Sequence, residues 1–280
     1  SIFQGANMIS FQKMQPAPEN VTIIIKTFQR PKTVAGAIAK IRQFYPTIPI
    51  FLADDSRNPV DIKDPNLRLY RLPFDTGISK GRNLMLADVE TEYFVLMDDD
   101  HYFTRQTSLK TLVDIATTYE FDCLSCWVFN CPIYKRDFLR KQLANFYMNI
   151  ELSNGIFHYI SGAHHRASDH IVCDLIPNFF LARTAKIKAI GGWEESLKVA
   201  EHSEFFLRAK QHGLKVGYTP LVSVDHKTLK SERFSTSYAD FRARIPEFRK
   251  IWIEKYNIRK IIKRDGSSVS AEDYIVESNW

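Results

Sequence analysis

Apolar runs and helical repeats alternate along the first hundred residues. VTIIIKTF, at 21–28, is a continuous apolar and β-branched run, which is typical of a strand buried on both faces of a sheet. After Pro31, apolar residues recur at helical spacing as far as residue 45. Further strands are predicted at 48–57, 66–73 and 93–100, and a glycine-bearing loop that leads into a helix is predicted at 75–89. This order predicts an α/β domain with an open, mostly parallel sheet flanked by helices.

The second half of the chain is less regular. It predicts helices at 107–119 and 201–213 and strands at 121–129, 177–184 and 215–226. Residues 150–175, which are rich in histidine, have the composition of a loop. We therefore expect a lead-in over 1–19, whose first seven residues resemble a cloning remnant, a main domain over 20–230, and a basic, amphipathic, helical C-terminal extension over 231–280.

The composition fits a globular enzyme-sized domain. A chain of 280 residues with 45% hydrophobic content can bury one large core. No apolar run approaches the ~20 residues that a membrane-spanning helix needs, and no signal peptide is evident. Cys123 and Cys126 form one CxxC, but no second pair of cysteines or histidines completes a zinc pattern, so we expect ordinary buried thiols.

The net charge of +6 is concentrated near the C-terminus. Between Arg242 and Arg264 nine Lys and Arg face two Glu, so the other residues sum to about −1, which excludes a wholly basic nucleic-acid-binding protein. The basic segment has two interpretations. It is either an arm that packs on the body or on a second subunit of a homodimer, or a peripheral membrane segment. In the second case, four residues would enter the lipid headgroups, namely Phe248, Trp252, Ile253 and Tyr256.

Polar residues follow three predicted strands at their carboxyl ends. They lie at Thr27 to Arg30, at Asp54 and Asp55, and at Asp98 to His101. Because the carboxyl ends of parallel strands meet at one edge of a sheet, we expect these residues to share a ligand-binding edge. Adjacent carboxylates repel one another unless water screens them or a cation lies among them. Carboxylate oxygens suit Mg²⁺ or Mn²⁺, so the acidic triplet predicts a metal and diphosphate site.

Other polar residues each allow a functional and a structural interpretation. Asp54 or Asp55 can accept the imide N–H of a pyrimidine or cap the following turn. Arg82, and less strongly Lys80, can balance a diphosphate or lie on the surface. Glu201 and Glu204 share one face of a predicted helix, where one of them can deprotonate an acceptor hydroxyl, or both can be solvated.

Five ordered motifs resemble those of GT-A glycosyltransferases, the large inverting class typified by family 2. They are KTFQR (26–30), ADDSR (53–57), GISKGRN (77–83), MDDDH (97–101) and EHSEFFLRAKQHGLKVGYTPLVSVDH (201–226). Within this class the chain is most similar to the β-1,4-N-acetylgalactosaminyltransferases of ganglioside synthesis, through TIIIKTFQRP, GRNLMLADVETEYFVLMDDDHYFT, NFFLART and EFFLRA. The resemblance covers roughly residues 20–228 and implies a Rossmann-like GT-A fold.

The resemblance also implies roles for the matching residues. Asp55 would face uracil, Thr27, Phe28 and Arg30 would surround the base, and Asp98 or Asp99 would touch the ribose. Arg82, and less strongly Lys80, would lie near the diphosphate of the nucleotide. The metal would be held by Asp100, Asp98 and His226. Family 2 usually has Glu-Asp where this chain has Glu201-His202, which leaves the base open. Because the N-acetylgalactosaminyltransferase-like relatives keep His-x-Glu-Phe-Phe, as at 202–206, Glu204 is the first choice and Glu201 the second.

The implied function is Mn²⁺- or Mg²⁺-dependent inverting transfer of a sugar, N-acetylgalactosamine first, from a UDP-sugar to a hydroxyl of a glycan or glycolipid. Acceptor contacts are expected at His165, Asp174 and Asn178. The alternatives are UDP-galactose, UDP-glucose or UDP-N-acetylglucosamine as donor, a non-catalytic metal-dependent carbohydrate-binding protein, or a sugar-nucleotide phosphatase or nucleotidyltransferase. We expect a cytoplasmic location, peripheral at the inner membrane face, for a bacterial protein, and the Golgi lumen for a eukaryotic one.

Overall fold

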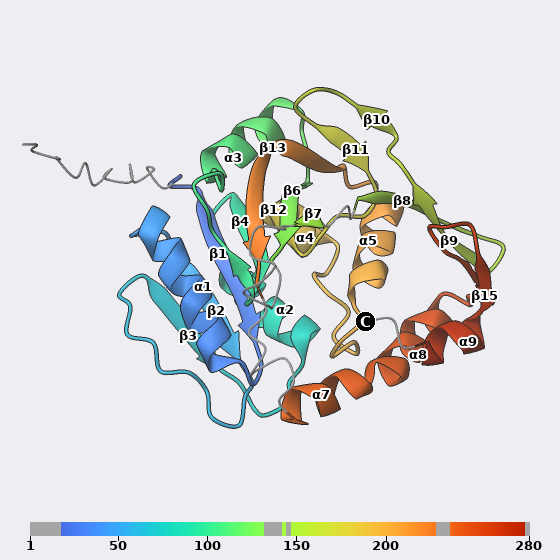
Figure 1. Ribbon diagram of the computed structural model, residues 1–280, viewed down its shortest axis with the longest axis horizontal. Helices are drawn as coiled ribbons and strands as arrows, with labels where there is room; N and C mark the ends of the chain where they lie inside the picture. The colour runs from blue at the N-terminus through green and yellow to red at the C-terminus, as the bar shows by residue number, and fades with distance from the viewer. Residues whose placement is uncertain (1–17, 132–141, 144–146, 228–235, 278–280) are drawn as a thin grey trace, which may run out of the picture.

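A large mixed sheet forms the centre of the protein (Figure 1). The computed structural model describes residues 18–131, 142–143, 147–227 and 236–277, so the predicted lead-in lies almost wholly outside the described residues. Four neighbouring strands are parallel, in the order β3 (Leu67–Arg71), β2 (Ile50–Asp54), β1 (Val21–Thr27) and β4 (Tyr93–Asp98). All seven residues of β1 are buried, as the apolar run predicts for a central strand.

The other half of the sheet reverses direction beside β4. β12 (Phe179–Arg183) is antiparallel to β4 and to β6 (Cys123–Asn130), and β13 (Val216–His226) is parallel to β6. The edge is completed by β11 (Ile171–Cys173) and β10 (His165–Arg166), while the short β5 (His101–Tyr102) and β7 (Gln142–Leu143) pair with β13 and β6. The predicted α/β fold with a mostly parallel open sheet is confirmed.

Helices cover both faces of the sheet. α1 (Pro31–Phe44) and α3 (Leu109–Thr118) pack with Ile23 and Ile25 of β1, whereas α2 (Ile78–Asp88), α4 (Thr184–Ala189) and α5 (His202–Gln211) pack on the face that carries Ile24. The two faces differ because successive side chains of a strand point to opposite sides. Each helix therefore finds an apolar layer, and the predicted helices in this part of the chain are confirmed.

The prediction of a loop over 150–175 is wrong. β8 (Met148–Ser153) and β9 (Ile156–Ser161) form an antiparallel hairpin, and β14 (Lys260–Ile262) and β15 (Ser268–Ser270) extend it to a second sheet. Asn154 and Gly155 turn the hairpin with φ angles of 52° and 74°. Asn-Gly is a strong signal for a two-residue hairpin turn, because both central positions need positive φ.

The C-terminal extension packs on the body. It contains α7 (Thr236–Ala243), α8 (Ile245–Lys255) and α9 (Ala271–Val276) besides the two strands, and Figure 1 shows α7 and α8 running from α2 to the second sheet. Phe248, Trp252 and Ile253 are at most 3% exposed in the same core as α5. In this arrangement these three side chains are covered by the body of the protein. No helix in the described part of the chain is long and apolar enough to cross a bilayer.

Candidate active site

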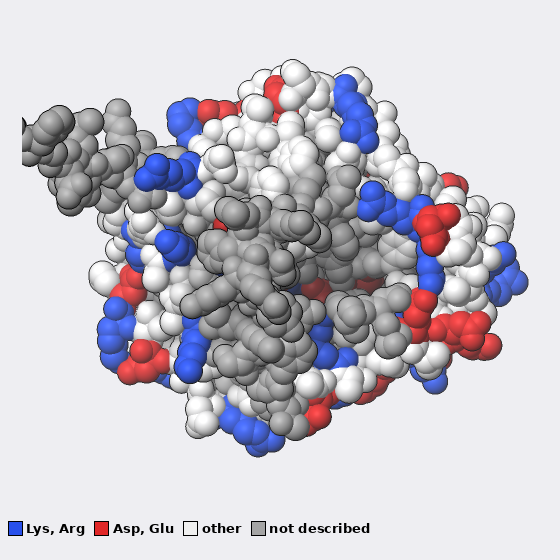
Figure 2. Space-filling view, viewed as in Figure 1, with Lys and Arg blue, Asp and Glu red and all other residues white. Residues whose placement is uncertain are grey.

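Three strand ends bring the predicted polar residues to one edge of the sheet. Lys26 of β1 pairs in register with Ala53 of β2 on one side and with Asp98 of β4 on the other. The motifs KTFQR, ADDSR and MDDDH therefore meet at this edge, as the sequence predicts. Figure 2 shows a hollow near the centre of this face, with acidic atoms on its floor and basic atoms along its lower rim.

Arg82 links the acidic triplet to the start of α5. Its Nη2 donates to Asp98 Oδ1 at 3.0 Å and its Nη1 donates to Glu201 Oε1 at 2.6 Å. The guanidinium is buried and lies 5.5 Å from the centre of the Trp193 ring. Burial opposes ionisation of Glu201, but the charge of Arg82 outweighs it and lowers the pKa of Glu201. Glu201 is therefore ionised at neutral pH and lies at the site.

Asp98 and Asp99 face different surroundings, because successive side chains at the end of a strand point to opposite sides. The Asp98 side chain is 37% exposed, whereas Asp99 is 1% exposed. Asp99 accepts from Thr27 Oγ1 at 2.6 Å and pairs with Arg30. Burial, with help from the neighbouring Asp100 charge and against Arg30, raises the pKa of Asp99 to about 7. Of the two residues predicted to touch ribose, only Asp98 presents accessible surface.

Asp100 lies between two cationic groups. Arg30 Nη1 donates to its Oδ2 at 2.8 Å, and His226 Nε2 lies 3.2 Å from the same oxygen. Burial opposes ionisation, but Arg30 and His226 together hold the pKa of Asp100 well below its usual range. Burial also lowers the pKa of His226, and the hydrogen bond to Asp100 outweighs this and raises it. Arg30, which the resemblance placed near the base, therefore pairs with two acids of the triplet, Asp99 and Asp100.

Three residues of the triplet region fit a divalent cation. Asp98, Asp100 and His101 form the one group of potential ligands found in the described residues, with one ligand atom from each lying within 4.8 Å of the others. His101 Nδ1 accepts from the Asp98 backbone N–H at 3.0 Å, which leaves Nε2 for a cation. Burial lowers the pKa of His101 to about 3, so the ring is neutral, as a ligand must be. Two carboxylates and an imidazole suit Mn²⁺.

His226 stands next to this group. Its Nδ1 lies 2.8 Å from Asn130 Oδ1 while Nε2 faces Asp100. The group of potential ligands thus adds His101 to the predicted Asp98 and Asp100, while His226, whose Nε2 lies 3.2 Å from Asp100 Oδ2, stays a predicted ligand.

The two aspartates after β2 have separate tasks. Asp54 accepts from the backbone N–H groups of Ser56, at 2.9 Å, and Val60, at 2.8 Å, so it caps the turn. Asp55 accepts from Gly77 N at 2.7 Å and pairs with Lys26. Asp54 thus caps the turn after β2, whereas the Asp55 carboxylate contacts Lys26 at the end of β1.

Phe28 lies in an aromatic cluster beside Asp55. Its ring centre is 5.5 Å from that of Phe74 and 4.7 Å from that of Phe241 in α7. The C-terminal extension therefore contributes to the region where the base is expected. Lys80, by contrast, is exposed on α2, and no hydrogen bond or ion pair joins it to the described residues.

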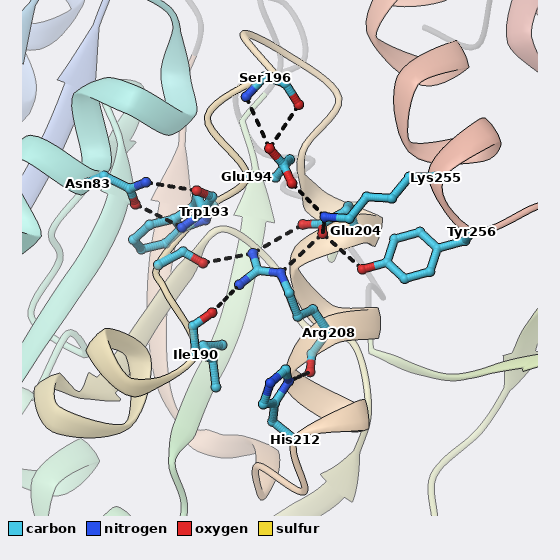
Figure 3. Close-up of polar contacts among 11 residues, drawn as sticks. Asn83, Ile190, Trp193, Glu194, Ser196, Glu204, Arg208, His212, Lys255 and Tyr256 are labelled. Carbon is cyan, nitrogen blue, oxygen red and sulfur yellow. Dashed lines mark hydrogen bonds and ion pairs between the residues drawn. The ribbon is translucent and has the colours of Figure 1, made fainter.

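Glu204 lies away from the strand ends. It is 0% exposed and accepts from Arg208 Nε at 3.1 Å, Lys255 Nζ at 3.1 Å and Tyr256 Oη at 3.0 Å. Figure 3 shows Lys255 and Tyr256 reaching from the end of α8 toward Glu204 on α5. Glu201 is the residue before α5, so the two acids do not share surroundings as predicted. Glu204 therefore holds the end of α8 against α5. These contacts do not favour Glu204 as the catalytic base.

His202 forms hydrogen bonds with the segment that precedes β12. Its Nδ1 lies 2.8 Å from Asn178 Oδ1, and its ring also hydrogen-bonds the backbone of Ile176. Burial lowers the pKa of His202 to about 4, so the ring is neutral. Phe179 pairs with Met97, which places Asn178 beside Asp98. Asn178 is therefore the one predicted acceptor residue that lies at this edge in the described structure.

The other two acceptor candidates lie elsewhere. His165 is exposed on β10, at the far end of the sheet order from β4, five strands away. Asp174 pairs with Lys210, near the C-terminal end of α5, at 2.7 Å and with His164 at 2.9 Å. His165 and Asp174 therefore do not lie beside Asp98 in this structure, and their role as acceptor contacts stays a prediction. The sequence could not place them, because the pattern over 150–175 predicts a loop where the structure has strands.

Three residues at or near the site were not singled out from the sequence, namely Lys26, Asn130 and Trp193, and His101 was expected at the edge of the sheet without a role as a ligand. Lys26 carried a signal, since it is a charged residue in an otherwise apolar buried strand. His101 carried one too, because it directly follows the acidic triplet. Asn130 and Trp193 reach the site only through tertiary contacts with His226 and Arg82.

Comparison with known sequences supports the same family. The model described as glycosyl transferase family 2 matches residues 22–190. Beta-1,4 N-acetylgalactosaminyltransferase 1 of Mus musculus is 37% identical over 209 residues, which cover 74% of this chain and 38% of that protein. Beta-1,4 N-acetylgalactosaminyltransferase 2 of Mus musculus is 32% identical over 220 residues, covering 76% of this chain and 41% of that protein. The chain thus spans less than half the length of the curated relatives it matches.

Comparison with solved structures supports the fold. GalNAc-T7, solved with UDP, GalNAc and Mn²⁺, matches with a TM-score of 0.58 at 12% identity and covers 85% of this chain and 50% of its own. Residues 1–349 of S. aureus TarS match with a TM-score of 0.52 at 16% identity, covering 85% of this chain and 69% of that one. The chain, with its acidic triplet at the edge of a mostly parallel sheet, belongs to glycosyl transferase family 2 and has the GT-A fold.

Proposed function

We propose that this chain transfers a sugar from a UDP-sugar to a hydroxyl of a glycan or glycolipid with inversion at the anomeric carbon, and that the transfer depends on a divalent cation. N-acetylgalactosamine is the first choice of sugar, because the relatives at 37% and 32% identity are named for that transfer. The observation that carries the proposal is the group of Asp98, Asp100 and His101 at the edge of the sheet, with Arg82 and Glu201 beside it.

The charge balance favours an anionic donor bound together with a cation. The carboxyl groups of Asp98, Asp99, Asp100 and Glu201 face the guanidinium groups of Arg30 and Arg82 and the imidazole of His226. When bound by Asp98, Asp100 and His101, a divalent cation would offset the negative charge that develops on the departing diphosphate. Arg82 can approach the same diphosphate, because its planar guanidinium already points into the cluster from α2.

For the base we favour Glu201 over Glu204. Glu201 is ionised, and Arg82 links it to Asp98 at the edge of the sheet. It would take the proton from the acceptor hydroxyl as that oxygen bonds to the anomeric carbon. The bond from this carbon to the diphosphate oxygen breaks on the opposite side, and its electron pair leaves with UDP, so the configuration inverts. No covalent enzyme intermediate is required.

The acceptor side is assigned to Asn178. This side chain lies beside Asp98 and is held by His202 at 2.8 Å, so its position is fixed by α5. The amide can hydrogen-bond a sugar hydroxyl while His202 keeps its orientation.

The test is a calorimetric titration of UDP in the presence of Mn²⁺ and again after chelation. We expect binding that depends on the metal, followed by slow hydrolysis of one nucleotide-sugar in a donor screen. Binding of sugar without nucleotide would identify a carbohydrate-binding protein instead. Hydrolysis that is equally fast with and without every acceptor would identify a phosphatase.

A further inference from the structure

The stretch between α4 and α5 ends on the proposed base. It runs from Ile190 to Glu201, and we call it the α4–α5 loop. Ala200, directly before Glu201, has a φ angle of 64°, a left-handed conformation that a Cβ makes unfavourable. Such a conformation persists only where the surroundings hold it in place. The contacts of this loop therefore determine where the Glu201 carboxylate lies.

Helix α2 holds the first half of the loop. The Asn83 side chain donates to the backbone oxygen of Trp193 at 2.8 Å and accepts from the Trp193 backbone N–H at 2.8 Å. Gly192 permits this approach, because a Cβ there would come too close to Asn83 Oδ1. The centre of the Trp193 ring lies 5.5 Å from the guanidinium carbon of Arg82, the partner of Glu201. Trp193 therefore couples the position of the loop to that of Arg82.

Lys255, at the end of α8, holds the next residue of the loop. Its Nζ donates to Glu194 Oε2 at 2.5 Å and to Glu204 Oε1 of α5 at 3.1 Å. The other oxygen of Glu194, Oε1, accepts from the backbone N–H and the hydroxyl of Ser196, at 3.3 Å and 2.9 Å. Figure 3 shows Lys255 reaching both carboxylates, with Trp193 next to Glu194. One ammonium group thus joins the C-terminal extension to the loop and to α5.

A second link joins the extension to a later part of the same loop. Asp75 Oδ2 accepts from Arg244 Nη1, just before α8, at 2.7 Å and from Lys198 Nζ at 2.9 Å. The backbone oxygen of Lys198 in turn accepts from the backbone N–H of Ile78, at the start of α2, at 2.9 Å. The C-terminal extension is therefore attached to the loop at Glu194 and, through Asp75, at Lys198.

The Lys255–Glu194 pair is too exposed to contribute much stability. The two side chains are 38% and 28% exposed, and ion pairs at such positions stabilise a fold weakly because water screens them. A link between two helices and a loop nevertheless restricts how the loop moves. Arg82 has its own attachment, on α2 and through Asp98, whereas Glu201 belongs to the loop. Loss of the link would therefore shift Glu201 relative to Arg82.

We propose that Lys255 is a positioning residue, which holds the α4–α5 loop so that Glu201 keeps its place beside Arg82 at the edge of the sheet. The proposal rests on the proposed function, in which Glu201 takes the proton of the acceptor hydroxyl. In this role α8 contributes to sugar transfer through the loop, without contact with the reacting groups. A displaced base slows the reaction, because proton transfer needs close approach. Donor binding should change little, since the acidic triplet lies outside the loop.

The pH dependence of transfer separates a positioning role from a purely structural one. Among the described residues, the charged or titratable groups that face Glu201 are Arg82 of α2, His202 of α5 and, through Arg82, Asp98 of β4. Burial opposes ionisation of Glu201, and Arg82 outweighs it, so the pKa of Glu201 is lowered. A loop that shifts Glu201 away from Arg82 would raise this pKa. The acidic limb of the rate profile should therefore move to higher pH.

The experiment measures kcat, the KM for the donor and the pH profile of the whole chain, of Lys255→Met and of Glu194→Ala. We expect each variant to lower kcat about tenfold, to keep the donor KM within about twofold, and to move the acidic limb to higher pH. The double variant should be no slower than either single variant, because both changes remove the same link. Lys255→Arg, whose guanidinium can bond both carboxylates, should keep most of the rate.

Lys250→Met is the matched control. It removes a lysine of the same helix, α8, which pairs with Glu254 at 3.6 Å, and it should keep both the rate and the pH profile. Thermal melting shows whether each variant is folded at the assay temperature, and Glu194→Ala carries the test if Lys255→Met is not.

Hydrogen exchange supplies a readout that needs no substrate. The backbone amides of residues 193–200 should exchange faster in Lys255→Met and in Glu194→Ala than in the unaltered chain or in Lys250→Met.

Unchanged exchange and an unchanged kcat would overturn the proposal. A lower kcat with the acidic limb of the unaltered chain, or losses that multiply in the double variant, would also overturn it and leave Lys255 as an ordinary stabilising contact. If the unaltered chain transfers no sugar from any donor, the proposed function itself fails, and the exchange measurement alone decides whether Lys255 holds the loop.

Discussion

Arg82 and Glu201 are joined by a 2.6 Å hydrogen bond although 119 residues separate them along the chain. The same guanidinium reaches Asp98 at 3.0 Å, so one side chain connects the strand end that carries the acids with the residue that starts α5. The Arg82 side chain is buried, and an arginine is favoured here because its planar group bonds two carboxylates at once.

Replacing Arg82 with lysine should lower the rate of sugar transfer by about a hundredfold, since a single ammonium cannot bond Asp98 and Glu201 together and also meet a diphosphate. The rate at saturating donor and acceptor measures this. Arg183→Lys is the control, because Arg183 pairs with the exposed Glu92 at 3.4 Å, and its transfer rate should stay within about twofold. An unchanged rate in Arg82→Lys would remove Arg82 from the site.

Asp100→Asn should weaken Mn²⁺ binding by at least about tenfold, because an amide oxygen is a poorer ligand than a carboxylate. Free Mn²⁺ can be measured by electron paramagnetic resonance without any substrate. Asp114→Asn removes an exposed carboxylate paired with Lys110 and should leave the affinity unchanged. Equal affinities for the unaltered chain and Asp100→Asn would mean that the cation, if any, binds elsewhere.

Glu204→Gln and Glu201→Gln should differ in the rate of sugar transfer by the folded protein. Loss of the Glu204 charge leaves Arg208 and Lys255 without their shared partner in a buried network, which should cost about 3 kcal/mol and lower Tm by several degrees. The folded fraction should still transfer sugar. Glu201→Gln should lower Tm as well, because it breaks the buried ion pair with Arg82, but its folded fraction should lose transfer. If the Glu204 variant lost transfer while keeping its Tm, the base would be Glu204 after all.

The stabilising effect of Asp75 should depend on pH. Asp75 pairs with Lys198 at 2.9 Å and with Arg244 of the C-terminal extension at 2.7 Å. Burial opposes ionisation, but these two cations lower the pKa of Asp75 below its usual 3.8. Because the folded pKa is lowered, the stabilisation is present above the ordinary pKa and is lost as pH falls through the lowered one.

Asp75→Asn should therefore lower the free energy of unfolding by about 1 kcal/mol near neutral pH, and the difference should close as the pH falls below about 4. Thermal melts from pH 3 to pH 8 measure it. Asp61→Asn, which removes an exposed partner of Lys63, should leave Tm nearly unchanged throughout. A gap that widened toward low pH would contradict the assignment.

The local pattern was enough for most of the large sheet. An unbroken apolar run such as 21–28 has to be buried on both faces, and the βαβ order then places the carboxyl ends of β1, β2 and β4 at one edge. The acidic triplet and Arg82 could be found for the same reason. The hairpin at 148–161 was not predicted, because its strands are short and mixed in polarity. Asn154-Gly155 is nevertheless a sequence signal for its turn.

The sequence by itself determined which residue types gather at the edge of the sheet, since strand direction and the alternation of side chains follow from hydrophobic pattern. Only the tertiary structure decided between neighbours of the same type. Asp54 caps a turn while Asp55 meets Lys26, and Glu204 anchors α8 while Glu201 meets Arg82. Such choices depend on partners far away in the chain, and the spacing of residues along one segment carries no information about them.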